Sequence, residues 1–205
     1  MQDFIAKAGP LFYPLLLCSL AAAAVAIERM VALRRARVLP REIAEVLSSV
    51  APGRDLSVVI DVCRRNPGVF ADVMRAGLEH AAEPWEIMRD ALQDAGRQRT
   101  PELGRHLVWL STIAQVAPLL GLLGTVLGMI KMFGAISLSG LGDPQALSGG
   151  ISEAMFTTAL GLGVGIPTLV AYNLLSSRSE ALVTEIEAHA THLIASLRGR
   201  NGEEV

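Results

Sequence analysis

Three long apolar runs constrain what this chain can fold into more than any other feature of its sequence. They cover residues 11–33, 107–136 and 151–175, with few charged residues inside them. A helix of about 20 apolar residues crosses roughly 30 Å of hydrocarbon at about 1.5 Å per residue. Each run is therefore predicted to be a membrane-spanning helix, and the 51% share of apolar residues agrees with a membrane location.

The composition narrows the class of membrane protein. Aromatic residues make up 4% of the chain and there are 19 glycines, which favours helices packed through small residues over a β-barrel with aromatic girdles. The net charge of −2 gives no positive electrostatic field, which argues against a nucleic-acid-binding protein. Two cysteines, Cys18 and Cys63, are too few for a disulfide framework. The predicted fold class is an all-α, polytopic membrane protein with three transmembrane helices.

Basic residues set the expected orientation. They crowd the exit of the first span, as Arg29, Arg34, Arg35 and Arg37. By the positive-inside rule, residues 1–10 lie outside the cytoplasm and residues 34–106 form a cytoplasmic domain. Residues 137–150 are then a short connection on the outer side, and residues 176–205 are a cytoplasmic helix and tail. An Ala-Val-Ala at 24–26 also resembles a signal-peptide cleavage site, but the basic charge follows the apolar run instead of preceding it.

Residues 34–106 carry apolar positions at three- and four-residue spacing, broken by proline and glycine, which predicts several short helices. A helical apolar stripe also continues beyond the third span, through Leu182, Ile186, Leu193 and Leu197. The second and third spans are therefore predicted to extend into a cytoplasmic helical region. We expect the protruding third helix to pack against other helices of its kind.

Eleven of the nineteen glycines fall between residues 121 and 165. Four-residue spacing places glycines on one helix face, where a neighbouring backbone can approach closely. The glycines predicted to pack are Gly121, Gly124, Gly128, Gly161 and Gly165. Static packing is favoured over sliding of smooth faces. Pro118 and Pro167 are predicted kinks in the second and third spans.

Glu153 is the most informative residue, because an ionisable group inside a span is costly unless it faces protein or water. A helix beginning at Asp143 and Pro144, a good cap and first-turn pair, places Glu153 about 13 Å along its axis. A helix beginning at Ile151 leaves it at the outer interface. The longer helix is favoured, and Lys131 is expected to reach the headgroups near the same end of the second span.

Three threonines are candidate neighbours of Glu153. Thr157 and Thr158 lie one turn further along the third span, and Thr125 is a polar position in the second span. One interpretation is a wet, lumen-lining face with a proton path, since a desolvated carboxylate can exchange protons near neutral pH. The other is structural, with each hydroxyl bonded to its own helix backbone. The residues alone leave both open.

No catalytic or metal site is predicted. Ser152 has no histidine or lysine nearby in the membrane to act as its base. His189 and His192 share a helix face, but two histidines without further ligands are a weak metal signal. We therefore expect no enzyme activity.

Two segments carry a family resemblance: APLLGLLGTVLGMIKMF at 117–133 and GISEAMFTTALGLGVGIPTLVAYN at 150–173. Together with the basic exit of the first span, they resemble the ExbB/TolQ/MotA proton-channel family, and most closely its ExbB/TolQ branch. MotA-like stators have two early spans before their large cytoplasmic domain, and this chain has one.

The resemblance implies an inner-membrane subunit of a motor driven by the proton motive force. Five copies would surround a lumen that holds two single-span partners resembling ExbD or TolR, with lipid around the ring. A membrane aspartate of the partner would carry the protons, beside Glu153, Thr158 and Thr125. Protons would be the coupling ion, with no other cofactor, and the work would go to a TonB- or TolA-like protein.

A non-conducting membrane scaffold, assembled through the glycine-rich faces, is the alternative function. The sequence leaves open the client (TonB, Tol, or gliding and export), the partner stoichiometry and the choice of proton or sodium. It also leaves open whether Glu153 itself titrates.

Overall fold

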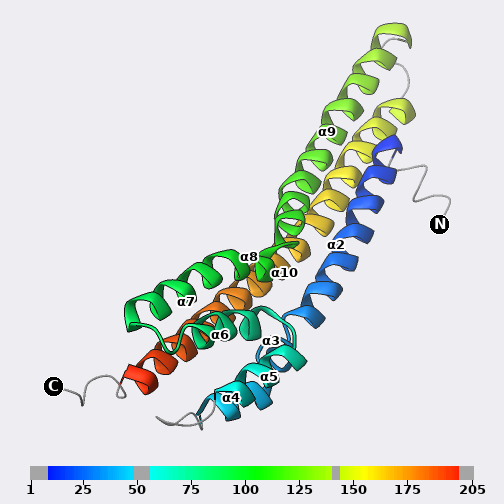
Figure 1. The fold of residues 1–205 in the computed structure, drawn as a ribbon. Coiled ribbons are helices and arrows are strands. Elements are labelled where there is room, and N and C mark those ends of the chain that lie inside the picture. The colour runs from blue at the N-terminus through cyan, green and yellow to red at the C-terminus, as the bar shows by residue number, and fades with distance from the viewer. Residues whose placement is uncertain (1–8, 49–55, 140–143, 199–205) are drawn as a thin grey trace. The chain divides into compact units, whose positions relative to one another are not determined.

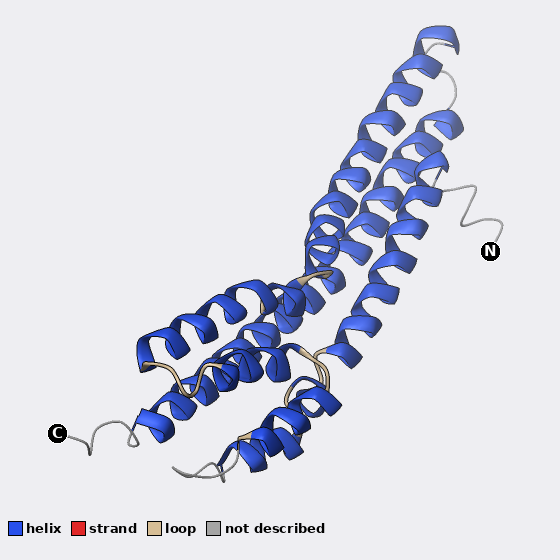
Figure 2. Cartoon of the chain, in the orientation of Figure 1, coloured by secondary structure: helices blue, strands red, loops and turns tan. Residues whose placement is uncertain are grey.

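The computed structural model describes residues 9–48, 56–139 and 144–198. These residues form helices and connecting loops, and no strand occurs among them (Figure 2). The predicted all-α class is confirmed. Asp143, the expected helix cap, lies outside the described residues.

The helices follow one another along the chain as in Figure 1. They are η1 (Gly9–Leu11), α2 (Phe12–Ala32), α3 (Arg35–Val38), α4 (Arg41–Ser48), α5 (Ser57–Arg65), α6 (Val69–Glu79), α7 (Trp85–Arg99), α8 (Pro101–Gly104), α9 (Leu107–Ser139) and α10 (Pro144–Arg198).

Three of these helices are long and apolar enough to cross a membrane. The candidate spans are Phe12–Ala32, Leu107–Gly134 and a stretch within Ser148–Leu197, which is 50 residues long. The prediction of three helices that could cross a membrane is therefore confirmed. The third helix continues well past the length that a bilayer needs, which is about 20 residues.

The chain divides into two compact units. The first contains residues 1–29 and 106–174, and the second contains residues 30–105 and 175–205. Helix α10 contributes its first half to the first unit and its second half to the second.

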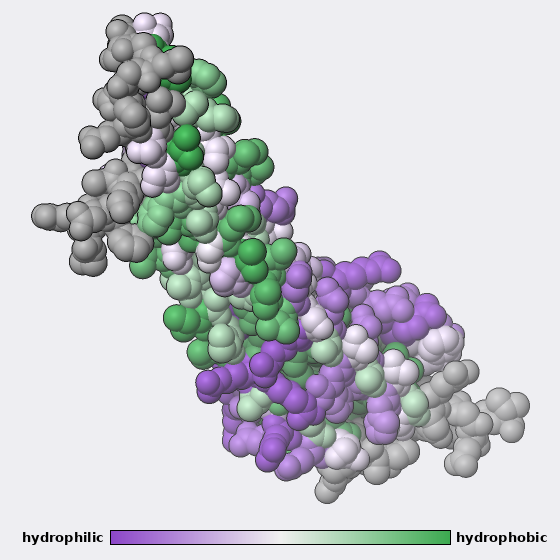
Figure 3. Space-filling model, turned by 180° about the vertical axis from the view of Figure 1, so that it is seen from behind, coloured by the Kyte–Doolittle hydropathy of each residue, from purple (hydrophilic) through white to green (hydrophobic). Residues whose placement is uncertain are grey.

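The first unit, built from α2, α9 and the first half of α10, exposes apolar side chains over its surface (Figure 3). Leu17, Val108 and Leu174 are each about two-thirds exposed. A soluble protein rarely exposes a continuous apolar surface of this kind. Lipid or neighbouring protein must cover it, so we call this part the membrane unit.

The second unit has a conventional buried core and a polar surface (Figure 3). Phe70, Met74 and Ile43 are fully buried in it, and Ile186 of α10 is 1% exposed. The Phe70 ring meets the His189 ring edge-on at 5.2 Å between centroids. The second half of α10 is therefore a core helix of this unit.

This arrangement corrects one expectation from the sequence. The apolar stripe beyond the third span was expected to pack against other protruding helices. Instead, Leu182, Ile186, Leu193 and Leu197 are all buried within the chain's own second unit. Residues of the short helices α4, α6 and α7 lie beside this half of α10.

Ion pairs link helices on the surface of this unit. The Arg35 guanidinium of α3 donates to both carboxylate oxygens of Glu185 on α10, with Nε at 3.0 and 3.1 Å. Arg99 lies 3.4 Å from Asp72 and 3.0 Å from Glu102. The carboxylates raise the pKa of both guanidinium groups. Exposed pairs of this kind contribute little each, at about 0–1 kcal/mol.

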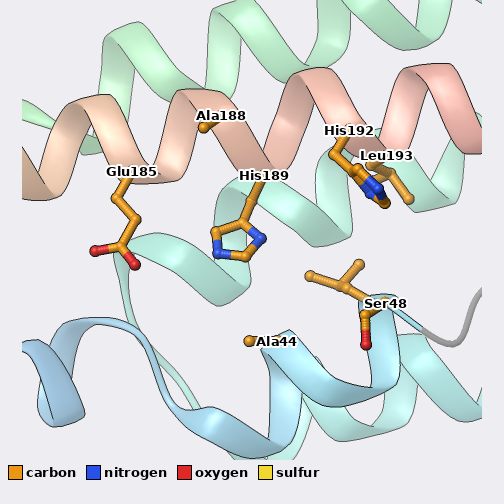
Figure 4. A pocket seen from close by; sticks show the side chains of 8 residues that line it. Ala44, Ser48, Glu185, Ala188, His189, His192 and Leu193 are labelled. Carbon is orange, nitrogen blue, oxygen red and sulfur yellow. The ribbon is translucent and has the colours of Figure 1, made fainter.

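A pocket of about 330 Å³ lies between α4 and the second half of α10 (Figure 4). Ala44 and Ser48 line one side, and His189 and His192 line the other. No group of three or more metal-ligating side chains occurs in the described part of the chain. His189 instead packs against Phe70, as a core side chain does.

Both cysteines are free thiols, and Cys63 is buried in the second unit. Burial raises the pKa of the Cys63 thiol to about 11. Because the thiolate is the reactive form, we expect native Cys63 to react with maleimide far more slowly at pH 8 than the same residue in denaturant. The raised pKa also predicts a stability contribution that is complete below about pH 9 and lost as the pH rises toward 11. Thiol labelling of the native and the denatured protein, followed by mass spectrometry, checks the labelling rate, and equal rates would contradict the prediction. The stability of the native protein measured over a series of pH values checks the second expectation.

Phe70 is the largest fully buried side chain of the second unit. Phe70→Ala removes its contact with His189 and leaves a cavity, so we expect a loss of about 3–5 kcal/mol in the free energy of unfolding. Val58, which is exposed, provides the control as Val58→Ala. The comparison is made by chemical denaturation in detergent, and equal midpoints for both variants would show that α10 is not packed there.

Candidate functional site

The candidate site is the contact between α9 and α10 in the membrane unit, where the two backbones approach closely. A Cβ atom at Gly161 of α10 would lie 2.6 Å from the carbonyl oxygen of Ala117. A Cβ atom at Gly121 of α9 would lie 3.1 Å from Cα of Thr158. Neither position has room for a larger side chain without a shift of backbone.

The same contact continues in both directions along the helices. Gly165 lies against Pro118, whose Cγ would be 2.6 Å from an added Cβ. At the other end, a Cβ at Gly128 would meet the Gly150 carbonyl oxygen at 2.9 Å. The five glycines named from the sequence, Gly121, Gly124, Gly128, Gly161 and Gly165, all lie in this contact.

Two prolines lie inside the long helices. Pro118 is within α9 and Pro167 is within α10, and each helix continues through its proline. Pro118 contributes to the helix contact through Gly165. Pro167 lines a shallow hollow between α2 and α10. Kinks at these positions remain a prediction.

The threonines named from the sequence occupy different environments. Thr157 is 1% exposed and lies directly against Gly124. Its hydroxyl donates to the Glu153 carbonyl oxygen at 2.7 Å. This places Thr157 in the helix contact and not on an open face, so the lumen-lining role expected for it does not fit its burial.

Thr158 and Thr125 remain partly exposed. The Thr158 hydroxyl donates across the contact to the carbonyl oxygen of Gly121, at 3.0 Å. The Thr125 hydroxyl donates within its own helix to Leu122, at 2.6 Å. Thr158 therefore links the two helices, whereas Thr125 satisfies its own backbone. Sequence reasoning missed Thr168, a buried threonine of α10 that donates to Val164.

Glu153 and Lys131 form an ion pair between the two helices. The Lys131 Nζ lies 2.6 Å from Oε1 of Glu153. Helix α10 begins at Pro144, so Glu153 lies about 13 Å along it, as the longer-helix interpretation requires. The expectation that Lys131 reaches the headgroups remains a prediction, and its ammonium pairs with this carboxylate. The lysine side chain is 54% exposed and the glutamate side chain 22%.

A second polar cluster joins α2 to the residue that precedes α9. Glu28 accepts from Arg29 at 2.6 Å and from the His106 ring at 3.0 Å. Arg29 is 9% exposed, and its Nε has no hydrogen-bond partner among the described residues. From the sequence, Arg29 counted only toward orientation, and His106 carried no signal.

The fold and this helix pair define a polytopic, all-α membrane protein with polar groups held between two of its spans. The model of the MotA/TolQ/ExbB proton channel family matches residues 66–188. The chain therefore belongs to this family, and its relatives place it in the ExbB/TolQ branch.

Three relatives illustrate the similarity. The ExbB-like 3 biopolymer transport protein of Synechocystis is 34% identical over 86% of this chain and 87% of its own length. ExbB of Helicobacter pylori is 46% identical over 40% of this chain and 56% of its own. TolQ of Pseudomonas aeruginosa is 33% identical over 58% and 48%. Together with the three apolar helices, these relatives support a bacterial inner-membrane protein.

The glycine contact makes a matched prediction. Gly161→Ala pushes a methyl group against the Ala117 backbone, and overpacking of this kind costs about 1–3 kcal/mol. Gly163→Ala, two residues on, has open space around the new methyl group and should be neutral or slightly stabilising. Thermal unfolding in detergent compares the two variants. If both leave the midpoint unchanged, the close approach of α9 and α10 is refuted.

Proposed function

We propose that this chain is the inner-membrane subunit of a motor driven by the proton motive force. With a single-span partner resembling ExbD or TolR, it converts proton flow into mechanical work on a TonB- or TolA-like protein. The observation that carries the proposal is the polar helix pair in the membrane unit of a proton-channel family member.

In the proposed assembly, five copies form a ring and α9 and α10 line its lumen. Two partner helices stand in the lumen, and an aspartate in them carries the protons. Glu153, Thr158 and Thr125 are the polar groups of this chain beside that path. Thr157 packs against Gly124 in the contact between α9 and α10, and so helps hold these helices in place.

The exposed side chains of α9 support an assembly of several chains. Large apolar residues project from it along its length, among them Val108, Leu119, Leu122, Ile130 and Phe133. The polar positions Thr125 and Lys131 on the same helix favour one face toward a lumen and another toward neighbours or lipid.

The proposed orientation keeps the N-terminus in the periplasm and the second unit in the cytoplasm. The basic side chains Arg34, Arg35 and Arg37 follow α2 directly, as the positive-inside rule requires of a cytoplasmic loop. The client system, whether nutrient uptake, envelope maintenance, or gliding and export, is identified by the proteins that copurify.

A non-conducting scaffold is the second candidate. The observation in its favour is that the described threonine hydroxyls of the site donate to backbone carbonyls, as structural groups do. The scaffold needs the glycine contact and no ion movement. It therefore predicts the same assembly without proton flux.

The proposal is tested on the complex extracted from its own host. Native mass spectrometry should find five copies with a small single-span partner that carries a membrane aspartate. Inverted membrane vesicles with these proteins should conduct protons under an imposed potential. A monomer or dimer without such a partner, in vesicles that conduct no better than those lacking the chain, favours the scaffold.

Variants of Glu153 refine the test. Glu153→Gln keeps the side chain's size and hydrogen-bonding capacity, so we expect it to retain part of the proton flux. Glu153→Ala removes both and should retain less. The dye-reported flux in inverted vesicles measures the difference. Wild-type flux in both variants would exclude a central role for Glu153.

A further inference from the structure

We propose that Lys131 is a positioning residue that holds the Glu153 carboxylate in a fixed ion pair. In consequence, Glu153 does not itself carry protons through the lumen. This inference rests on the proposed function and assigns a role to a lysine that no sequence motif singles out. Its basis is the 2.6 Å approach of Nζ to Oε1, between two helices of one chain.

The glycine contact creates the geometry of this pair. Gly128 lies three residues before Lys131 on α9, and its closest neighbours are Gly150 and Ala154 of α10. Ala154 directly follows Glu153. Because the two backbones touch at this level, the long lysine side chain spans the remaining distance to the carboxylate. The ion pair of Lys131 and Glu153 remains partly exposed.

The charges explain why the pair matters. Lys131 lies inside the candidate span Leu107–Gly134, where a lone charge is costly. Binding of a proton to Glu153 would leave the ammonium unpaired, and loss of the ammonium would leave the carboxylate unpaired. Removing one partner leaves an uncompensated charge within the span, whereas removing both leaves none. A variant must therefore keep the pair electrically neutral in order to function, and it need not keep the carboxylate itself.

The polar neighbours of the pair agree with a fixed role. The Thr157 hydroxyl donates to the backbone oxygen of Glu153 and helps hold the turn that carries it. The Thr158 hydroxyl ties the next residue of α10 to Gly121. One hydroxyl therefore braces the Glu153 turn within α10, and the other ties α10 to α9 five residues further along. A group that shuttles protons would instead need freedom to move or a chain of exchangeable donors.

A double-mutant cycle tests the proposal in the complete complex, expressed in its own host with its native partner genes. The variants are Lys131→Gln, Glu153→Gln, their combination, and the conservative Lys131→Arg. Met129→Leu, an exposed apolar change on the same helix, is the control. Proton flux into inverted vesicles is measured from pH 5 to 9, with the amount of assembled complex determined in each preparation.

We expect each glutamine single variant to lose flux about tenfold, which is within the coupling range of contacting residues. The double variant should recover to within about threefold of wild type and keep the wild-type pH profile. Lys131→Arg and Met129→Leu should both behave as wild type. Two results overturn the proposal: a double variant no better than Glu153→Gln, or wild-type flux in Lys131→Gln. The first would make Glu153 a proton carrier, and the second would make the lysine irrelevant.

Failure of the proposed function gives a different result. In that case wild-type vesicles conduct no better than vesicles lacking the chain. The same set of variants is then compared by the temperature at which each purified complex dissociates. Single variants below wild type and a recovered double variant support the pair, and a Lys131→Gln temperature equal to wild type overturns it.

Discussion

The structure of the membrane unit depends on one contact, the close approach of the α9 and α10 backbones. Apolar helices in lipid gain little from the hydrophobic effect when they associate, because lipid tails are as apolar as their side chains. Packing and hydrogen bonds must hold them together instead. The contact of Gly161 with Ala117 allows the packing, and the Thr158 hydroxyl adds a hydrogen bond to Gly121. The Lys131–Glu153 pair forms at the distance that this contact sets.

Much of this unit is predictable from the sequence, because helical periodicity and span length are local properties. Four-residue spacing alone places Gly124 and Gly128 on one face, and three apolar runs alone give three spans. The direction of individual side chains is less accessible. Thr157 and Thr158 are adjacent, yet one fills the helix contact and the other bonds across it. A rotation of α10 by a fraction of a turn exchanges these roles, and only the packing fixes that rotation.

Long-range pairs are the other limit of sequence reasoning. Lys131 and Glu153 are 22 residues apart, and Arg35 and Glu185 are 150 apart. A lysine near the end of a span has a general tendency to reach the headgroups, and that tendency does not predict the Glu153 partner of Lys131. The His106–Glu28 contact had no signal at all, because both residues are unremarkable in their own segments. Each of these pairs depends on which helices become neighbours.

The second unit is discontinuous in the chain, and this has a consequence for how the protein is made. Residues 30–105 leave the ribosome first, and Phe70 lacks its ring contact with His189 until the second half of α10 is available. That half follows the last membrane helix in the chain, so both α9 and the first half of α10 are synthesised before it. Completion of the second unit therefore waits until the second half of α10 has been synthesised. Until then the helices of residues 30–105 expose apolar surface and must stay soluble. Their many charged side chains keep them soluble at this stage, as well as in the finished protein.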